Sequence, residues 1–154
     1  MDTWWIDEPR LLGSRNLTTA DLEQLRGDGF NVLVSLLQEE EQAPSYDVSR
    51  AEALGFVRHN IPVEDFHPPT VDQLDQFVNL IDHLPDGSKV VVHCQGGTGR
   101  TGTFAAAYWV AKGIPVPGAI AHVRELRRHA IETPEQVAAL ERYAAGRKGS
   151  AWSP

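Results

Sequence analysis

The sequence contains very little cysteine: Cys94 is the single one among 154 residues. A lone cysteine excludes a disulfide within the chain and a metal site built from several thiolates. It is typical of proteins that work in a reducing compartment. Any chemistry of this chain that needs a thiol therefore depends on Cys94.

Long apolar runs and an excess of basic residues are also missing. No uninterrupted apolar stretch approaches the roughly 20 residues that span a membrane, and the first five residues lack the basic and apolar regions of a secretion signal. We therefore expect a soluble cytoplasmic protein without a membrane partner. The formal net charge of −7 opposes general binding to nucleic acid, which needs a clustered positive field. Any anion specificity should be local.

The length and composition suit one compact domain. With 154 residues, 42% of them apolar and 23% charged, the chain is ordinary for a globular protein. A chain of this size buries roughly 70% of its unfolded surface without disulfides or metals. We expect a single domain over residues 1–146 and a flexible C-terminal tail over residues 147–154.

Short apolar runs alternate with helical patterns over the first two thirds of the chain, and helices dominate the last third. This order predicts an α/β fold with a central, mostly parallel twisted sheet flanked by helices. The apolar runs predict edge strands at 4–6 and 11–12, a strand buried on both faces at 31–37, and strands at 56–61 and 90–92. The helical patterns cover 18–27, 49–54, 70–84, 101–112 and 119–129, and a last helix begins at Thr133-Pro134.

Two pairs of polar residues have the spacing of helix caps. Thr18 is followed three residues later by Asp21, and Thr70 by Gln73. In such pairs each side chain accepts a hydrogen bond from the backbone N–H of the other residue. The pairs predict where two helices begin.

Several polar or proline-rich stretches should form loops and surfaces. Glu39–Glu41 predicts a solvated turn, and three prolines make 62–69 a stiff loop that excludes a helix interior or a central strand. Arg124, Arg127 and Arg128 suggest either a solvated helix face or a weak patch that attracts substrate.

The stretch from His93 to Gly102, HCQGGTGRTG, follows the apolar run at 90–92 and precedes a helical run. It predicts a strand, a tight loop and a helix start. Its glycines let successive backbone N–H groups point into one concavity, and such a nest beside a helix N-terminus binds an oxyanion. We therefore expect phosphate to bind at Gln95, Gly96, Gly97, Thr98, Gly99 and Arg100.

Cys94 and Arg100 stand at the two ends of this loop and suggest phosphoryl transfer. Helix N-termini and nearby cations favour the thiolate form of cysteine, so we expect Cys94 to be ionised at neutral pH. Arg100 can hold two phosphate oxygens at once, which would set the phosphorus for in-line attack by the thiolate. The Thr101 hydroxyl could donate to the sulfur and favour its departure in a second step. The alternative is a buried structural cysteine beside a glycine-rich turn.

Two nucleotide-binding motifs compete for the same residues. Residues 97–102 satisfy the dinucleotide pattern G-x-G-x-x-G, but the acidic ribose ligand should end a second strand about 20 residues later, and that region has a helical pattern. A nucleoside-triphosphate loop would need glycine at position 94 and lysine at position 100. Neither motif is complete.

The spacing Cys94-x5-Arg100-Thr101 after His93 resembles the signature of the cysteine-dependent protein tyrosine phosphatases. More specifically, residues 61–143 are similar to the small atypical dual-specificity phosphatases, the VHZ-like group. The shared motifs are Ile61-Pro62, Asp65-Phe66, Pro68-Pro69, the loop at 93–102, and Ile131-Glu132-Thr133 with Gln136. The resemblance implies a protein tyrosine phosphatase-like fold.

The chain departs from the pattern of that group at two places. Val63-Glu64 adds a carboxylate beside the expected acid, and Arg127-Arg128-His129 stands where many relatives have Arg-Pro-Gly. The first departure affects the assignment of the acid, and the second affects only a turn.

The resemblance implies that Asp65 is the general acid, which protonates the leaving oxygen and then acts as base on the hydrolytic water. A positioned acid suits this step, because an alkoxide or phenolate leaving group gains greatly from protonation. Glu64 and His67 are rivals for the role, and an inward-facing Phe66 could change which carboxylate reaches the site. Without such a role, Glu64 and His67 are solvated loop residues.

Glu132 and Gln136 have both a structural and a functional interpretation. Thr133, Pro134 and Gln136 have the spacing of a capping box at the start of a helix. The resemblance implies instead that Gln136 or Glu132 orients the attacking water. His93 is expected to order the loop without touching the substrate.

These observations predict a phosphomonoester hydrolase that works through a cysteinyl-phosphate, without a metal or organic cofactor. The leading substrate is phosphotyrosine in a protein or peptide, with phosphoserine and phosphothreonine as further candidates, and inorganic phosphate or another oxyanion should bind at the loop.

Other functional classes fit the sequence less well. A phosphoinositide or other non-protein phosphatase is the alternative, although residues 95–98 offer no lysine for extra phosphates. A non-catalytic phosphate-binding module would need the loss of the cysteine, the arginine or the acid, and none is missing. A sulfur-transfer or arsenate-reducing domain is the remaining class, but arsenate reduction usually recruits further thiols.

Overall fold

The computed structural model describes residues 1–151, with backbone only from residue 148 onward. Five strands form one sheet in the order β1-β2-β5-β3-β4. Neighbouring strands are parallel except β1 and β2, which run antiparallel. The predicted α/β fold with a mostly parallel sheet is confirmed. The strands are β1 (Thr3–Asp7), β2 (Leu11–Ser14), β3 (Val32–Leu37), β4 (Val57–Val63) and β5 (Val90–His93).

The two ends of the sheet differ from the sequence-based expectation. The strand at 11–12 is not an edge strand, because β2 lies between β1 and β5 and both of its leucines are buried. At the other edge, β4 runs through Pro62 to Val63. An edge strand tolerates proline because not every N–H needs a partner in the ladder. The proline-rich loop therefore begins only after Val63.

The central strand β5 sets the position of the loop that follows it. Its residues Val90–His93 pair with Leu11–Ser14 of β2 and with Val32–Ser35 of β3. All four residues are buried, as expected for a strand covered on both faces. Since β3, β4 and β5 are parallel, the segments that follow them converge at one edge of the sheet, where ligands bind in open α/β folds.

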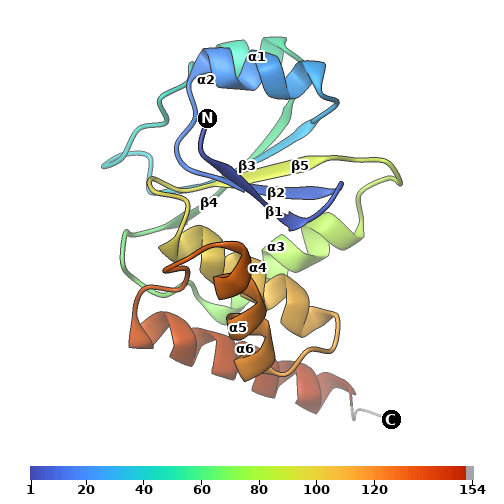
Figure 1. The fold of residues 1–154 in the computed structure, drawn as a ribbon, viewed down its shortest axis with the longest axis vertical. Coiled ribbons are helices and arrows are strands. Elements are labelled where there is room, and N and C mark those ends of the chain that lie inside the picture. The colour runs from blue at the N-terminus through green and yellow to red at the C-terminus, as the bar shows by residue number, and fades with distance from the viewer. Residues whose placement is uncertain (152–154) are drawn as a thin grey trace.

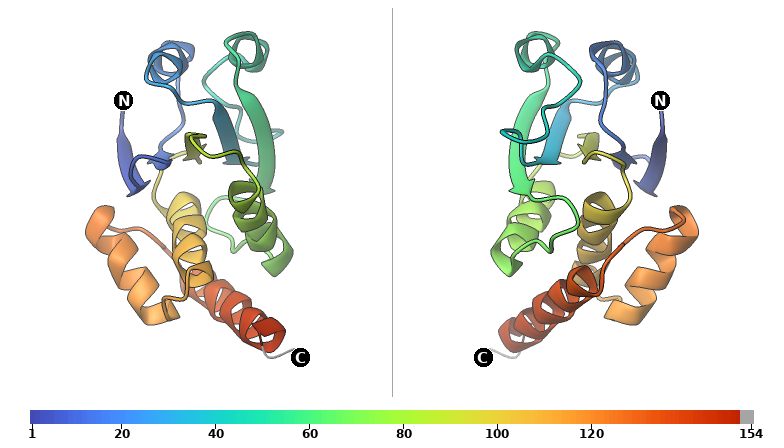
Figure 2. Two further views of the ribbon diagram at one scale, coloured as in Figure 1. Left: turned by 90° about the vertical axis from the view of Figure 1, so that its right-hand side faces the viewer. Right: turned by 90° about the vertical axis from the view of Figure 1, so that its left-hand side faces the viewer.

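Helices cover both faces of the sheet (Figure 1, Figure 2). One hydrophobic cluster fills the space between the sheet and α3 to α6, and a second lies under α1 and α2. No helix in the described part of the chain is long and apolar enough to cross a membrane. The helices are α1 (Thr19–Gly27) and α2 (Val48–Ala53) on one face, and α3 (Val71–Asp82), α4 (Gly99–Ala111), α5 (Val116–Leu126) and α6 (Pro134–Ala151) on the other.

Both predicted capping pairs are confirmed. The Thr18 hydroxyl accepts from the Asp21 N–H while the Asp21 carboxylate accepts from the Thr18 N–H, and Thr70 makes the same reciprocal pair with Gln73. Each pair satisfies two backbone donors that a helix start leaves open. They fix the first residues of α1 and α3.

Three helices have bounds that differ from the prediction. α4 begins at Gly99 rather than at residue 101, so that Arg100 lies in its first turn. α5 begins at Val116, because Pro117 falls in the first turn where its missing N–H is not needed, and it ends at Leu126. α6 continues to Ala151 into the expected tail, since an isolated glycine in a helix costs only about 1 kcal/mol. Residues 152–154 of that tail lie outside the described residues.

Candidate active site

The loop after β5 holds Cys94 between the sheet and α4. Cys94 is 2% exposed. Its sulfur accepts a hydrogen bond from the Gly97 N–H at 3.2 Å and another from the Thr101 hydroxyl at 3.0 Å. One donor belongs to the glycine turn and the other to the first turns of α4. Together they fix the sulfur at the base of the loop.

Gly97 occupies a position that only glycine fits. Its φ is +78°. A Cβ at this position would lie 2.7 Å from the Arg15 nitrogen and 2.9 Å from the Ser14 carbonyl carbon, closer than real Cβ contacts. The Gly97 carbonyl also accepts a hydrogen bond from Trp4 Nε1 at 3.0 Å. The hairpin of β1 and β2 therefore supports the loop directly.

The Arg100 guanidinium is buried and held by neighbouring loops. The residue is 1% exposed. Nη1 donates to the Val63 carbonyl at 2.9 Å, and Nη2 donates to Gln42 Oε1 at 2.8 Å and lies 3.3 Å from Asp65 Oδ1. Nε is buried and has no hydrogen-bond partner among the described residues. Since buried donors are nearly always paired, this one fits an oxygen of a bound anion.

Asp65, not Glu64, is the carboxylate that lies at Arg100. Glu64 and His67 are exposed and face each other, with 3.7 Å between Glu64 Oε2 and His67 Nδ1. Phe66 is 59% exposed at a φ of +64°, and its N–H donates to Asp65 Oδ1 at 3.0 Å. Phe66 therefore faces solvent rather than inward. The backbone here points the Asp65 side chain toward the loop and leaves the two rival groups at the surface.

Glu132 and Gln136 border the loop and make hydrogen bonds within the protein. Gln136 Oε1 accepts from the N–H groups of Glu132 at 2.8 Å and Thr133 at 3.2 Å, and the Gln136 N–H donates to the Thr133 hydroxyl. This is the predicted capping box of α6. Gln136 Nε2 also donates to the His67 carbonyl at 3.4 Å, and Glu132 Oε1 accepts from the Thr98 hydroxyl at 3.3 Å. The start of α6 thus contacts both the glycine-rich loop at 93–102 and the loop after β4 that carries Asp65.

His93 lies behind the loop in a buried hydrogen-bond chain. Arg58 Nε donates to the Tyr46 hydroxyl oxygen at 3.2 Å, and that hydroxyl is 2.8 Å from His93 Nε2. His93 Nδ1 is 3.3 Å from the Cys94 carbonyl oxygen. Burial, assisted by the positive charges of Arg58 and Arg100, lowers the pKa of His93 to about 4 despite its bond to the Cys94 backbone. The imidazole is therefore neutral at pH 7.

Three arginines were predicted to form a solvated helix face or a patch that attracts substrate: Arg124 and Arg128 are exposed, and Arg124 and Arg127 also bind loop backbone. Arg124 donates to both carbonyls of residues 130–131, at 3.0 and 2.9 Å. Arg127 binds the Asp2 carboxylate with two bonds of 2.7 Å and donates to the Gly96 carbonyl at 3.2 Å. The side-chain hydrogen bond from Arg127 lowers the pKa of Asp2. Arg124 and Arg127 brace the rim of the site.

Sequence reasoning missed Gln42, Tyr46 and Arg58. The expected solvated turn is correct for its exposed residues, but Glu39 forms an ion pair with Arg58. A usable signal was present, because the segment from 38 to 46 follows a parallel strand and so reaches the same sheet edge as Cys94.

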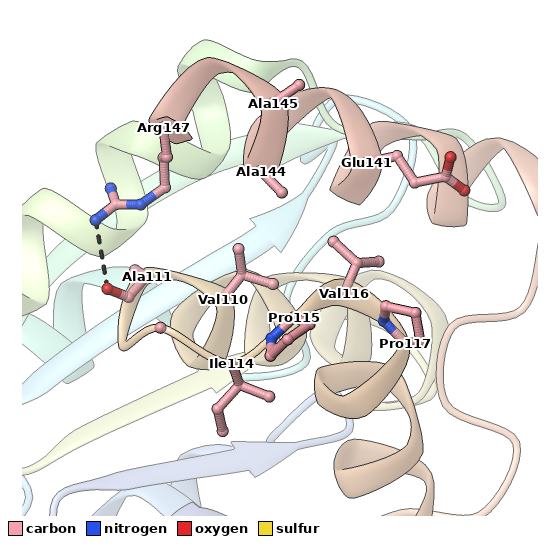
Figure 3. Close-up of a pocket in the computed structure, with 11 residues that line it drawn as sticks. Val110, Ala111, Ile114, Pro115, Val116, Pro117, Glu141, Ala144, Ala145 and Arg147 are labelled. Carbon is pink, nitrogen blue, oxygen red and sulfur yellow. Dashed lines mark hydrogen bonds between the residues drawn. The ribbon is translucent and has the colours of Figure 1, made fainter. Parts of the chain in front are cut away.

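A separate groove of about 600 Å³ lies between the α4–α5 turn and α6 (Figure 3). Its lining side chains are apolar except for Glu141 and Arg147, and Arg147 donates to the Ala111 carbonyl at 3.4 Å. Within the described residues there is no group of three or more metal-ligating side chains. The reactive side chains gather instead at the carboxyl edge of the sheet.

Comparison with known proteins places the chain in a family. A sequence model for DSP-PTPase phosphatases of polymorphic toxin systems matches residues 10–114. Mouse protein tyrosine phosphatase type IVA 3 is 30% identical over 141 residues, which cover 87% of this chain and 78% of the mouse protein. The crystal structure of Tk-PTP in the active form is 31% identical, with a TM-score of 0.85 over 93% of this chain and 96% of that one.

An archaeal relative is more similar over a shorter region. The uncharacterized protein MJECL20 of Methanocaldococcus jannaschii is 44% identical over 78 residues, 49% of this chain and 52% of that protein. The chain thus spans about half the length of the first curated relatives that it matches. On the family match, the chain belongs to the DSP-PTPase phosphatases of the cysteine-based protein tyrosine phosphatase superfamily.

Proposed function

We propose that this chain is a cysteine-dependent phosphomonoester hydrolase whose leading substrate is protein phosphotyrosine. One observation carries the proposal: the buried side chains of Cys94 and Arg100 lie at opposite ends of one loop, and Arg100 Nε has no partner among the described residues while Asp65 lies beside the same guanidinium. A buried structural cysteine would not require this combination of groups.

In the first step, the Cys94 thiolate attacks phosphorus as the ester P–O bond breaks. Arg100 and the backbone N–H groups of 95–100 hold the phosphoryl oxygens and stabilise the charge that they carry in the transition state. Asp65 gives its proton to the leaving oxygen. The products are the free alcohol or phenol and a cysteinyl-phosphate.

In the second step, water forms the new P–O bond and the P–S bond breaks. Asp65 takes a proton from the water, so the acid is regenerated and no external reagent is needed. The Thr101 hydroxyl, 3.0 Å from the sulfur, stabilises the departing thiolate. We assign the orientation of the water to Glu132 or Gln136, which border the loop.

The proposal also covers the extent of the domain, its location in the cell and the kind of phosphate ester that it hydrolyses. We treat residues 1–146 as one phosphatase domain, and we propose a cytoplasmic location because a thiol nucleophile needs a reducing environment. The absence of lysine from residues 95–98 favours a singly phosphorylated group over a phosphoinositide.

A substrate panel at fixed pH tests this proposal. We expect turnover of p-nitrophenyl phosphate and of phosphotyrosine peptides, slower turnover of phosphothreonine peptides, and little turnover of phosphoinositides. Cys94→Ser should abolish all of it. An inactive wild-type protein, or full turnover by Cys94→Ser, would refute the proposal. A preference for phosphoinositides would show that the substrate is a phosphorylated lipid rather than a phosphorylated protein.

A further inference from the structure

We propose that Gln42 is a positioning residue that sets the separation between Arg100 and the Asp65 carboxylate, and so couples phosphate binding to proton donation. This inference rests on the function proposed above. Gln42 lies in the segment between β3 and α2, outside the phosphatase motifs of the sequence. Its side chain is the only one described that bonds to both groups.

Gln42, Arg100 and Asp65 form a closed ring of side chains. Gln42 Oε1 accepts from Arg100 Nη2 at 2.8 Å, and Gln42 Nε2 donates to Asp65 Oδ2 at 3.1 Å. The ring closes where Arg100 Nη2 lies 3.3 Å from Asp65 Oδ1. Each end of the amide therefore meets a group of the opposite polarity.

An amide suits this position better than the alternatives of similar size. It offers an acceptor at one end and a donor at the other, which matches a guanidinium and a carboxylate. A carboxylate at position 42 would accept from Arg100 but would face Asp65 with a like charge. An aliphatic chain would leave both partners without this contact. The two partners also define which end of the amide carries the oxygen.

The ring holds Arg100 while leaving part of it for the substrate. The Val63 carbonyl accepts a hydrogen bond from Arg100 Nη1 at 2.9 Å, and Gln42 Oε1 accepts one from Nη2. The guanidinium is therefore held from two sides. Nε has no partner among the described residues. A phosphate bound to this guanidinium therefore lies next to the carboxylate that Gln42 holds. The Gln42 side chain therefore sets the position of the Asp65 carboxylate relative to the bound phosphate.

The segment that carries Gln42 is itself well anchored. The Gln42 N–H donates to the Gln38 carbonyl at 2.9 Å and closes a turn. Asn16 holds the following stretch, since it donates to the Ala43 carbonyl at 3.1 Å and accepts from the Ser45 N–H at 3.0 Å. A group that positions catalytic side chains needs such support from its own neighbours.

The test compares two aryl phosphates whose leaving groups depend differently on an acid. Phenyl phosphate releases a poor leaving group and needs protonation, whereas p-nitrophenyl phosphate releases a good one. In Gln42→Met the chain length is kept and both hydrogen bonds are lost. We expect kcat/KM to fall about tenfold more on phenyl phosphate than on p-nitrophenyl phosphate, a part of the 10²–10⁴-fold that general acid catalysis supplies.

Two further variants sharpen the comparison. Gln42→Glu keeps the acceptor for Arg100 but repels Asp65, so the same selective loss on phenyl phosphate is expected. Glu41→Met places the same new side chain at an exposed position of the same turn, and both rates should remain at the wild-type value. Thermal unfolding of each variant establishes that the compared proteins are folded.

The selective loss should also disappear once the acid is gone. In an Asp65→Asn background, adding Gln42→Met should lower both rates by the same factor, because the residue acts through Asp65. Equal losses on the two substrates in the single variant, no loss at all, or a selective loss that persists without Asp65 would each overturn the inference. An inactive wild-type protein would instead refute the phosphatase function itself.

Discussion

At the scale of single residues, the neighbouring hydrogen-bond donors determine which ring nitrogen of His93 carries the proton. Because Arg58 Nε–H donates to the Tyr46 oxygen, the Tyr46 hydroxyl hydrogen is free to point at His93 Nε2. The ring proton then lies on Nδ1, where it donates to the Cys94 carbonyl. A neutral imidazole of this tautomer anchors the backbone of Cys94 from behind. The loop thus depends on residues that never touch a substrate.

The burial of His93 makes the free energy of unfolding depend on pH. The unfolded chain takes up a proton on His93 near pH 6.5 and the folded chain only near pH 4, so the free energy of unfolding should fall as pH decreases through this window. The full shift is worth roughly 3 kcal/mol. Denaturant unfolding at pH 7.5 and at pH 4.5 measures most of this loss. His93→Gln should lose this part of the pH dependence, and an unchanged dependence in that variant would contradict the assignment.

Gly97 offers a second test at the residue scale. In Gly97→Ala the new methyl group would meet backbone atoms of residues 14 and 15 at a positive φ, so we expect the variant to lose about 1–3 kcal/mol of stability and its binding of inorganic phosphate. Gly87→Ala is the matched control, because Gly87 also has a positive φ but no atom lies within 4 Å of its Cβ position. The control should keep its phosphate binding by calorimetry, and equal behaviour of the two variants would count against a packed loop.

At the scale of elements, the turn between α5 and α6 holds strained backbone next to the site. His129 and Ile131 have φ values of 65° and 63°, which is unusual for residues other than glycine. Arg124 binds the carbonyls of residues 130–131, and Gly102 of α4 packs so closely that a Cβ there would lie 2.8 Å from Ala130 Cβ. These contacts keep the turn in place and hold Glu132 against the loop.

This strain predicts that His129→Gly stabilises the protein. Relief of the left-handed conformation contributes about 1–2 kcal/mol of stability, and the flexibility of glycine in the unfolded chain offsets part of it. We therefore expect a net gain of about 0.5–1 kcal/mol in denaturant unfolding. Ile131→Gly should do the opposite, because Ile131 is 2% exposed and loses its core packing. A destabilised His129→Gly variant would show that His129 makes contacts that outweigh the strain.

The starts of α1 and α3 were predictable because their signals are local. Thr18 and Thr70 each find their capping partner three residues away, and the glycine spacing of the anion loop lies within ten residues. The strand order carries no such signal, so the position of β2 inside the sheet, between β1 and β5, could not be read from residues 11–14. The start of α5 was predicted too late because Pro117 was interpreted as part of a break, whereas proline is also common in the first turn of a helix.

At the scale of the whole molecule, the parallel sheet assembles the site from segments far apart in the sequence. Gln42 meets Asp65 across 23 positions and Arg100 across 58, and Tyr46 meets His93 across 47. The nucleophile loop could be predicted from one motif, whereas these supporting residues depend on which strands lie side by side. The placement of Asp65 rather than Glu64 at Arg100 likewise required the conformation of the loop after β4.

The most direct test of the whole account is to trap the intermediate. Wild-type protein mixed with excess p-nitrophenyl phosphate and quenched within its first turnovers should carry phosphate on the peptide that contains Cys94, and Asp65→Asn should accumulate more of it if Asp65 is the base for hydrolysis. Mass spectrometry of the digested protein locates the label. Turnover without any phosphate on Cys94, or phosphate on another residue, would contradict the mechanism.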